Sequence, residues 1–419
     1  MATPKALPLL LECTLDVIAR QRAAGEPLDR VAAAVARARR LGPREREALG
    51  NLVFGWARQR EAAERLIVAE LKKHGGRAPA MRERDLCALL LAQGAAGGEI
   101  DPRARTKLEG PLGALVDDAA LSGLGAVLPA WLDARLRAER DDAPALLEAL
   151  ARPAPVGLAL DRARTSVDEV IAAVAATGAR ARPSPIVAGA VRVEGRLRLA
   201  RLPGELADAL WPMDEGSQAV ARALDARPGE LVLDLCAGAG TKTRLLLQSG
   251  ATVVAADVGA ARLMRAPAAA ARVVTDGLHA GLRAGAFDKV LVDAPCSGIG
   301  TLRRAPDLAH RLKEQDLAAL IDVQERLLTE ALALAKPGGL VVYATCSLLR
   351  DENEAVVERV LAQAAGARRT SLRALWGDDV KLDDEGKGEL RLLPHLHGTD
   401  GFYVAALRRL PRGPGRPQP

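Results

Sequence analysis

The chain has 419 residues, a formal net charge of +6 and a mean hydropathy of +0.03. Soluble domains run at about 100 to 200 residues, so this length predicts two or three domains and excludes a mini-protein with one small core. Aromatic residues make up 2% of the chain and hydrophobic residues 49%, so we expect cores built from Ala, Leu and Val. The excess of Arg and Lys favours an anionic partner such as a phosphate backbone, but an ordinary solvated surface explains it equally well.

The five cysteines lie far apart in the chain, at Cys13, Cys87, Cys236, Cys296 and Cys346. They form no CxxC pair, so we expect neither a metal site nor a disulfide framework. A reducing cytoplasm suits such a set of thiols. The apolar run from Ala6 to Leu11 is shorter than a secretory signal, and no run approaches the roughly 20 apolar residues of a spanning helix. We therefore expect a cytoplasmic monomer that does not contact a membrane.

Residues 1–142 are predicted to form an all-α domain. Apolar residues recur every three or four positions from Leu9 to Val17 and again from Leu49 to Trp56, and Gly42-Pro43 separates the two stretches. Arginines gather between Arg37 and Arg60. They line either an RNA-binding surface or a solvated helical face, and the sequence does not separate the two.

Residues 143–206 are predicted to form a small α/β connector. Its strand-like runs are Val156–Leu160 and Ala190–Val193, and Gly178 and Pro183 lie between them. The connector is the second basic region of the chain, with Arg162, Arg164, Arg180, Arg182, Arg192, Arg196 and Arg198.

Residues 207–410 are predicted to form a Rossmann-like α/β domain. Strand-like apolar runs alternate with helical segments, at Leu231–Leu235, Thr252–Ala256, Arg272–Thr275, Lys289–Val292 and Leu340–Ala344. Continuous runs of Val, Ile and Leu between helices indicate a parallel sheet that is covered on both faces, in a doubly wound fold. Residues 411–419 are rich in Pro and Gly and basic, which predicts a disordered tail.

A glycine-containing turn follows the first of these strands, in Asp234-Leu-Cys-Ala-Gly-Ala-Gly-Thr-Lys-Thr243. Such a turn lets a ligand approach the backbone closely at the carboxyl end of a strand. A dinucleotide fingerprint would place a third glycine at Thr243, and a phosphate-binding Walker loop would place glycines at Cys236 and Thr241. The sequence has neither pattern, so both kinds of phosphate cradle are disfavoured.

Acidic residues follow the next two strands, at Asp257 and Asp276. From its place in the chain, Asp257 is expected to accept hydrogen bonds from the hydroxyls of a ribose, and Asp276 from the amino group of an adenine. A single Asp at a strand end more often caps the following turn. A nucleoside without a pyrophosphate fits both, and S-adenosylmethionine is the commonest such ligand. The predicted cofactor contacts are Cys236, Ala237, Gly238, Ala239, Gly240, Thr241, Lys242, Asp257, Asp276 and Asp293.

Two cysteines follow the fourth and fifth strands, in Asp293-Ala-Pro-Cys-Ser-Gly298 and Ala344-Thr-Cys-Ser347. A lone cysteine is usually an inert small hydrophobic residue. Adjacent strand ends face one crevice, however, so Cys296 and Cys346 are expected within reach of one substrate. A thiolate that adds to C6 of cytosine makes C5 nucleophilic enough to accept a methyl group, and Asp293 is the candidate general acid for N3.

The catalytic half resembles the Sun/Fmu-type, RsmB-like RNA cytosine-C5 methyltransferases, whose motifs read DxCAxPGGKT, DAPCSGxGxxRRxPD, ATCSxxxxENE and DGFxxA. The matching segments are Asp234 to Thr243, Asp293 to Asp307, Ala344 to Ser347 with Glu352-Asn-Glu354, and Asp400 to Ala405, and Met213 to Gln218 resembles the motif that precedes them. The resemblance implies S-adenosylmethionine as cofactor and RNA as partner. It also implies that Cys346 is the nucleophile and that Cys296 assists release of the product.

The first half resembles the NusB-type helical RNA-binding domain of the bacterial members that act on small-subunit rRNA. This resemblance rests on Leu41-Gly-Pro-Arg-Glu-Arg46 and on Leu52-Val-Phe-Gly-Trp-Ala-Arg58. It implies methylation of small-subunit rRNA.

The glycine-containing turn departs from the family pattern, because Ala239 stands where the family has proline and Thr241 where it has glycine. The departure changes the stiffness of the loop and its room for the cofactor. Other readings therefore stay open: a tRNA methyltransferase, a DNA cytosine methyltransferase with Cys296 as nucleophile, an amino-methyltransferase, or a non-catalytic RNA-binding or ribosome-assembly factor. A DNA enzyme would carry a recognition insertion between strands, and an amino-methyltransferase an aromatic residue at Cys296; the sequence has neither.

Overall fold

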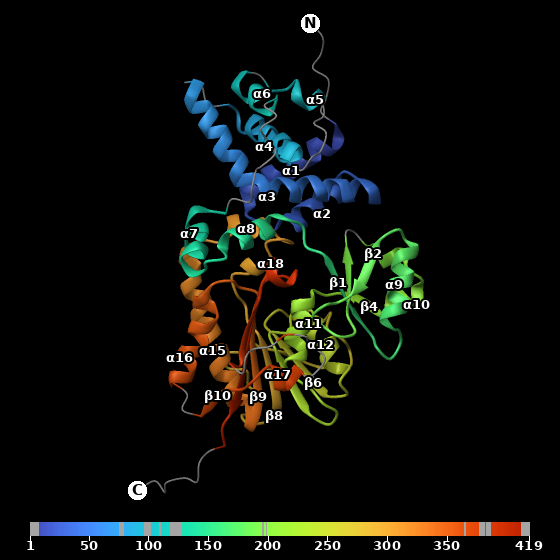
Figure 1. Cartoon of the computed structure of the whole chain (residues 1–419), viewed down its shortest axis with the longest axis vertical. Helices are drawn as coiled ribbons and strands as arrows, with labels where there is room; N and C mark the ends of the chain where they lie inside the picture. Colours follow the sequence, from blue (N-terminus) through green and yellow to red (C-terminus); the bar gives the residue numbers. More distant parts are fainter. Residues whose placement is uncertain are drawn as a thin grey trace. The chain divides into compact units, whose positions relative to one another are not determined.

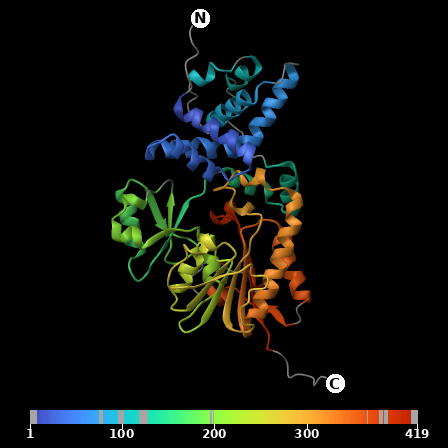
Figure 2. The ribbon, with the colours of Figure 1, turned by 180° about the vertical axis from the view of Figure 1, so that it is seen from behind.

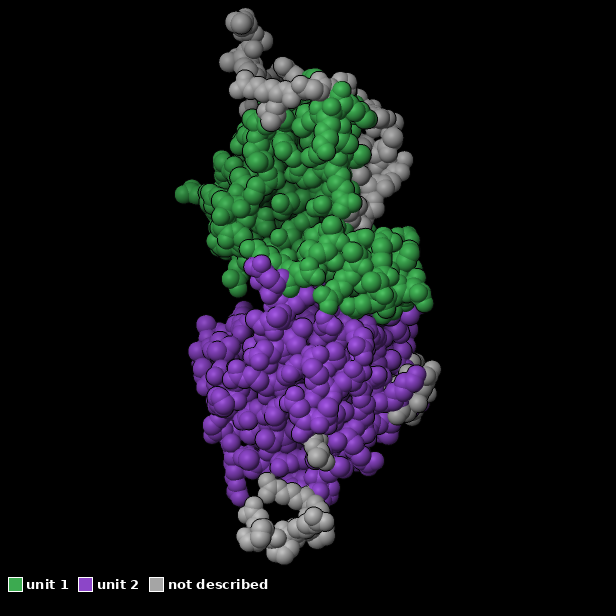
Figure 3. All heavy atoms as spheres, turned by 90° about the vertical axis from the view of Figure 1, so that its left-hand side faces the viewer, with its two compact units in different colours: residues 1–153, 302–314 green, residues 154–301, 315–419 purple. Residues whose placement is uncertain are grey.

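The computed structural model describes residues 8–74, 79–95, 102–108, 110–117, 128–194, 197, 199–363, 366–376, 382 and 387–411. The chain forms two compact units, which Figure 3 shows in different colours. Unit 1 comprises residues 1–153 and 302–314, and unit 2 comprises residues 154–301 and 315–419. The domain boundaries expected after residues 142 and 206 stay predictions, and the expected tail lies outside the described residues apart from Pro411.

Unit 1 is helical in its described part, as the apolar spacing predicts. Its helices are α1 (Leu9–Ala24), α2 (Leu28–Ala38), α3 (Pro43–His74), α4 (Met81–Ala95), α5 (Pro102–Arg105), α6 (Gly110–Asp117), α7 (Ala130–Glu139), α8 (Ala143–Ala151) and α14 (Leu308–Arg311). Gly25 ends α1 in the left-handed region with φ of 65°. Ile18, Val53 and Trp56 are among the residues of the buried core.

The segment 302–314 belongs to unit 1 although its first six residues are the end of the motif Asp293 to Asp307. Arg303 is buried, and its guanidinium group donates to the carbonyl oxygens of Arg152 and Pro153. Asp307 Oδ2 accepts hydrogen bonds from the backbone N–H of Leu28 at 3.3 Å and from Arg311 Nε at 2.9 Å. Leu28 begins α2, where backbone N–H groups lack partners within the helix. Asp307 therefore caps α2 from a distant part of the chain.

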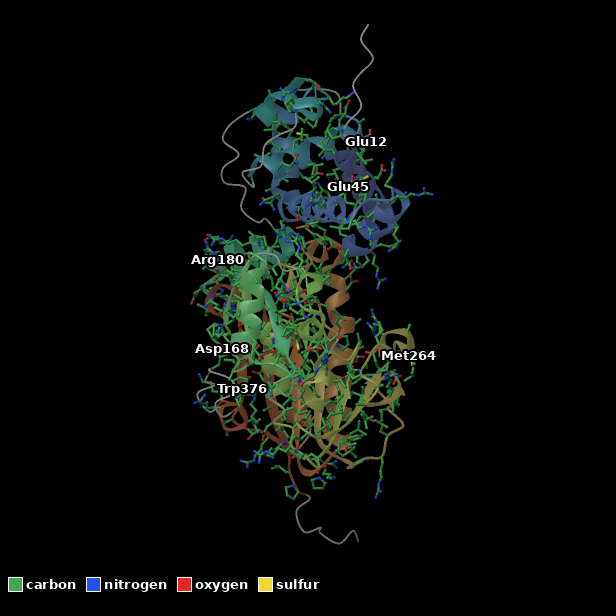
Figure 4. All side chains as sticks on the ribbon, turned by 90° about the vertical axis from the view of Figure 1, so that its right-hand side faces the viewer. Glu12, Glu45, Asp168, Arg180, Met264 and Trp376 are labelled. Carbon is green, nitrogen blue, oxygen red and sulfur yellow. The ribbon has the colours of Figure 1, made fainter. Side chains whose placement is uncertain are left out.

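Unit 2 begins with a small antiparallel sheet in the order β2-β3-β1-β4. Its strands are β1 (Val156–Leu160), β2 (Arg180–Pro183), β3 (Val191–Glu194) and β4 (Leu210–Pro212), and its helices are α9 (Val167–Ala176) and α10 (Gly204–Asp208). Ser166 and Glu169 form a capping box at the start of α9. Figure 4 labels Asp168 on α9 and Arg180 on β2, two exposed residues of this region.

A large sheet of eight strands follows, in the order β10-β12-β9-β8-β5-β6-β7 with β11 paired to β12. The strands are β5 (Leu231–Leu235), β6 (Thr252–Asp257), β7 (Ala271–Val274), β8 (Phe287–Asp293), β9 (Ala335–Thr345), β10 (Ala367–Arg369), β11 (Glu389–Leu392) and β12 (Phe402–Arg409). Strands β5 to β9 pair in parallel, which confirms the predicted core. Strand β12 runs antiparallel to β9. The motif Asp400 to Ala405 covers the first residues of β12, and no strand is predicted there from the sequence.

Helices cover both faces of the large sheet (Figures 1 and 2). One face carries α11 (Glu215–Arg222), α12 (Thr241–Leu247), α13 (Ala260–Leu263) and α17 (Arg373–Trp376), and the other carries α15 (Leu317–Leu334) and α16 (Glu354–Gln363). Alternate residues of β9 serve the two cores: Val342 packs on the first face and Val341 and Tyr343 on the second. Across the described part of the chain, no helix is both long and apolar enough to cross a membrane.

Candidate active site

The glycine-containing turn between β5 and α12 has three residues in the left-handed region of φ, which favours glycine. Cys236, Gly238 and Gly240 have positive φ values of 86°, 59° and 77°. A Cβ atom on Gly240 would lie 2.6 Å from the Cβ of Ala266, so glycine is required there for both conformation and space. The N–H groups of Cys236 and Ala237 both donate to the carbonyl oxygen of Ala256, which ties the turn to the end of β6.

The two departures from the family motif fall at positions that need no glycine. Neither Ala239 nor Thr241 has a positive φ. Thr241 is the first residue of α12, and Gly240 precedes it as the N-cap. An ordinary L-residue fits both positions, so the altered sequence does not strain the turn.

Asp257 holds the turn in place. Its Oδ2 accepts a hydrogen bond from the N–H of Gly238 at 2.8 Å, and its Oδ1 accepts from the N–H of Gly259 and from Arg262 Nη2. The next residue, Val258, is 65% exposed.

Asp276 lies two residues beyond β7 and is exposed. Its Oδ1 accepts hydrogen bonds from the N–H groups of Leu278 and His279, at 3.0 and 3.2 Å. These bonds from His279 and Leu278 lower the pKa of Asp276. The carboxylate therefore caps the following turn, and its contact with an adenine stays a prediction.

Asp234, the penultimate residue of β5, belongs to the motif Asp234 to Thr243 but is not among the predicted cofactor contacts. It is 1% exposed, and its Oδ2 accepts a hydrogen bond from Thr243 Oγ1 at 2.6 Å. Its buried Oδ1 has no hydrogen-bond partner within the described residues. Burial raises the pKa of Asp234 to about 6. A buried carboxylate oxygen without a donor is costly, which makes Asp234 a candidate ligand contact.

Cys296 and Cys346 lie together, as expected from the order of their strands. Their Sγ atoms are 3.3 Å apart. Asp293 and Ala344 are paired in register at the ends of β8 and β9, and this pairing places the two cysteine segments side by side. The hydrogen bond with Cys346, burial and the nearby charge of Glu352 raise the pKa of Cys296 well above that of an ordinary thiol.

Lys242 and Asp293 form an ion pair of the same site. Lys242 Nζ lies 2.5 Å from Asp293 Oδ2 and 5.8 Å from the centre of the Phe402 ring. Burial lowers the pKa of Lys242, but the charge of Asp293 and its hydrogen bond more than reverse this effect, so the pKa is raised. Lys242 therefore belongs to the group around Asp293 rather than only to the glycine-containing turn. The proton of this pair resides on Lys242.

Gly300 packs the segment after Cys296 against that of Cys346. Its N–H donates to the carbonyl oxygen of Cys346, and its own carbonyl oxygen accepts from the N–H of Gly401, both at 2.8 Å. A Cβ atom on Gly300 would lie 2.1 Å from the carbonyl oxygen of Gly401. Any side chain at this position would separate Phe402 and its neighbours from the cysteines.

The sequence matches known families over most of its length. Residues 221–408 match the family model described as 16S rRNA methyltransferase RsmB/F, and residues 128–200 match that of the ferredoxin-like domain of RsmF/B-like methyltransferases. The ribosomal RNA small subunit methyltransferase B of Xanthomonas campestris is 34% identical over 383 residues, which cover 88% of this chain and 82% of that protein. The chain belongs to the RsmB/F family.

Other relatives agree with this assignment. The protein of the same name from Xylella fastidiosa strain 9a5c is 35% identical over 67% of this chain and 68% of its own. The crystal structure of PH0851 matches with a TM-score of 0.76 over 97% of this chain and all of its own, at 20% identity, which supports the fold. A methyltransferase homologue from Pyrococcus horikoshii matches with a TM-score of 0.53 at 28% identity, over 64% of this chain and 91% of its own.

Membership of the RsmB/F family confirms the predicted family, the predicted fold class and the predicted activity of an RNA methyltransferase that uses S-adenosylmethionine. The residues fit this cofactor. The unpartnered Oδ1 of Asp234 offers an acceptor for its ammonium group, and the open turn at Gly238, where a Cβ would meet nothing within 4 Å, leaves room for it. The individual cofactor contacts stay predictions.

Proposed function

We propose that this RsmB/F member methylates C5 of a cytosine in small-subunit rRNA through a covalent bond between Cys346 and C6. The observation that carries the proposal is the pair of thiols 3.3 Å apart at the ends of β8 and β9, with the Lys242–Asp293 ion pair in the same site. The choice of rRNA rests on relatives named ribosomal RNA small subunit methyltransferase B.

The first step is addition of the Cys346 thiolate to C6 of the cytosine. The electron pair of the C5–C6 double bond moves toward N3, which takes up a proton, and C5 becomes an enamine carbon. We take Cys346 as the attacking group because Ala344 to Ser347 matches the family motif whose cysteine is the nucleophile. Lys242 holds the proton of the ion pair, so we assign proton delivery to N3 to Asp293 with Lys242 as its source.

S-adenosylmethionine, when bound, supplies an electrophilic methyl group to C5. A base in the site then takes up the proton from C5, the electrons of the C5–H bond restore the C5–C6 double bond, and N3 gives up the proton that it gained in the first step. The C6–S bond breaks, and its electron pair leaves on Cys346. Cys296, at 3.3 Å, donates its S–H to the departing sulfur. This contact supports Cys296 as the residue that assists release.

The target cytosine has to be single-stranded or flipped out of a helix, because C6 must be approached from the face of the ring. Aromatic residues make up 2% of the chain. Exposed arginines such as Arg37, Arg40 and Arg44 in unit 1 supply the phosphate contacts in this proposal. A cytoplasmic location and a monomeric state belong to the same proposal.

The deciding experiment compares Cys346→Ala and Cys296→Ala with methyl-labelled S-adenosylmethionine and 16S rRNA. Cys346→Ala is expected to lose turnover without trapping RNA, and Cys296→Ala to accumulate a covalent protein–RNA adduct that survives denaturing electrophoresis. Cys13→Ala, in the core of unit 1, serves as the control exchange. An adduct in Cys346→Ala would reverse the roles of the two cysteines.

The substrate is tested with tRNA and 16S rRNA in parallel, and 5-methylcytosine is mapped by bisulfite sequencing. Methylation of tRNA alone would contradict the rRNA assignment. Failure to bind S-adenosylmethionine at millimolar concentration would favour a non-catalytic assembly factor.

A further inference from the structure

A buried carboxylate, Glu352, lies between the two cysteine segments. It belongs to η5 (Arg350–Glu352) and is 0% exposed. From the segment of Cys296, the N–H of Ser297 donates to Glu352 Oε1 at 2.8 Å and Ser297 Oγ donates to Oε2 at 2.5 Å. From the segment of Cys346, Ser347 Oγ donates to the same Oε2 at 2.5 Å. One side chain thus bonds the residues that directly follow both cysteines.

A fourth hydrogen bond to the carboxylate of Glu352 comes from another helix. Gln324 Nε2, on α15, donates to Glu352 Oε1 at 2.9 Å and also to the carbonyl oxygen of Pro295 at 3.0 Å. Glu352 therefore accepts four hydrogen bonds, two on each oxygen, which is the full capacity of an ionised carboxylate. Because each oxygen of the carboxylate has two donors, the position of Glu352 relative to Ser297, Ser347 and Gln324 is fixed. Gln324 Oε1 is the one buried atom of this group without a partner among the described residues.

The backbone around Glu352 is held as well. Tyr343 Oη donates to the carbonyl oxygen of Glu352 at 2.7 Å, and Asn353 Nδ2 donates to that of Ser347 at 3.1 Å. Asn353 Oδ1 accepts from Thr345 Oγ1 at 2.5 Å. The segment that supplies Glu352 is thus fastened to β9 and cannot move independently of Cys346.

We infer that Glu352 is a positioning residue that ties the segment of Cys296 to the segment of Cys346 and so holds the two thiols in contact. The consequence for catalysis rests on the proposed function. If Cys296 assists the departure of Cys346, the two sulfur atoms must stay in contact while the substrate enters and leaves. Strand pairing of β8 and β9 ends at Asp293 and Ala344, before either cysteine. Beyond it, the bond from the Gly300 N–H to the Cys346 carbonyl oxygen and the contact of the Ser297 and Ser347 hydroxyls at 3.1 Å also join the two segments. Glu352 adds bonds to the residue that directly follows each cysteine.

The test measures the proximity of the thiols without RNA or cofactor. Phenylarsine oxide condenses with two adjacent thiols, forms two As–S bonds and releases one water, and it binds tightly only when both thiols are within reach. Bound arsenical protects Cys296 and Cys346 from alkylation, which peptide mass spectrometry reads directly. We expect Glu352→Ala to weaken this binding by at least about tenfold, because the effective concentration of one thiol at the other falls.

Two other variants distinguish the loss of the hydrogen bonds to Glu352 from a general loss of stability. Glu352→Gln removes the charge but should retain protection. Its amide oxygen can accept hydrogen bonds from the Ser297 N–H and from Gln324. Its amide nitrogen can donate to the hydroxyls of Ser297 and Ser347, which then act as acceptors. The double variant Ser297→Ala with Ser347→Ala leaves the carboxylate in place and removes its two hydroxyl donors, but the backbone N–H of residue 297 still donates to it, so protection is expected to fall in part. This double variant also answers the question if Glu352→Ala fails to fold. Ser249→Ala, whose hydroxyl bonds only within its own turn, is the matched control.

Methylation is then measured in the same proteins. We expect kcat to fall in step with arsenical binding in Glu352→Ala, with KM for RNA unchanged, and Glu352→Gln to restore both. Full protection in Glu352→Ala or in the serine double variant, or loss of protection in a folded Glu352→Gln, would overturn the inference. If protection follows the expected pattern but Cys346→Ala still methylates RNA, the proposed function fails while the positioning role of Glu352 stands.

Discussion

The ammonium group of Lys242 lies 2.5 Å from the carboxylate of Asp293, which makes the two residues one proton-carrying unit. Either exchange, Asp293→Asn or Lys242→Met, is expected to lower the single-turnover rate of methylation by about 100-fold or more, the usual contribution of general acid catalysis. Because the two act on one proton, the double variant should be no slower than the slower single variant. Rapid-quench assays with saturating cofactor provide the comparison.

Calorimetry measures how tightly the same variants bind S-adenosylmethionine. Unchanged affinity would show that the loss of rate comes from proton transfer and not from a lost cofactor contact. Losses that multiply in the double variant would show that Lys242 and Asp293 act independently.

The raised pKa of Asp234 is expected to make the folded protein less stable as the pH rises. Its pKa is raised by burial to about 6 in the folded protein, above its ordinary value, so the folded state binds the proton more tightly than the unfolded state. The contribution is therefore fully favourable below about pH 4 and is lost as the pH rises to about 6, by roughly 2 to 3 kcal/mol. Urea unfolding of native protein and Asp234→Asn from pH 4 to 7.5 isolates this difference.

The Asn variant should lose the pH-dependent component and should also bind S-adenosylmethionine at least about tenfold more weakly, because it lacks the buried anion. Identical pH profiles of stability for the native protein and Asp234→Asn would show that Asp234 does not cause the pH dependence.

The glycine-containing turn should tolerate a proline at Ala239 but no side chain at Gly240. Gly240 has a positive φ and no room for a Cβ, so Gly240→Ala is expected to cost about 1 to 3 kcal/mol of unfolding free energy and to weaken cofactor binding. Ala239 has no positive φ, and its N–H makes no backbone hydrogen bond among the described residues. Ala239→Pro, the residue of the family motif, should therefore bind S-adenosylmethionine within about twofold of the native protein.

Thermal melting and equilibrium dialysis measure both effects. A cofactor affinity that rises strongly with Ala239→Pro would show that the family proline matters for more than backbone conformation.

The cap that Asp307 provides to α2 predicts a stability effect within unit 1. Asp307→Ala removes the acceptor for the Leu28 N–H and for Arg311, and it should lower the unfolding free energy of unit 1 by about 1 to 3 kcal/mol. Hydrogen exchange of the α2 amides reports this change locally. Asp322→Ala, whose side chain is 68% exposed, should change α2 exchange little.

Binding of RNA should depend steeply on salt. The chain is basic and poor in aromatic residues, so phosphate contacts by arginine outweigh base stacking. Fluorescence anisotropy between 50 and 200 mM salt is expected to show a loss of affinity of at least about tenfold. A flat salt profile would point instead to stacking or to direct contacts with the bases.

Local patterns in the sequence predicted much of unit 2. The runs of Val, Leu and Ala placed β5, β6, β7, β8 and β9, and the motifs after them placed Cys296 and Cys346 at neighbouring strand ends. These features follow from residues close together in the chain, because the apolar periodicity of a strand and the residue that ends it are local properties. Composition in turn predicted an aliphatic core, and the spacing of apolar residues predicted a helical first half.

Only the tertiary structure decided which side chains meet across the molecule. The pairing of Lys242 with Asp293, the four donors around Glu352, the cap that Asp307 provides to α2 and the insertion of β12 beside β9 join residues far apart in the chain. Asp234 and Asp276 make the same point: Asp234 lies within β5 and is buried, whereas Asp276 lies two residues beyond β7 and is exposed. Burial and hydrogen-bond partners depend on how distant segments pack, and no periodicity within a short stretch of sequence contains that information.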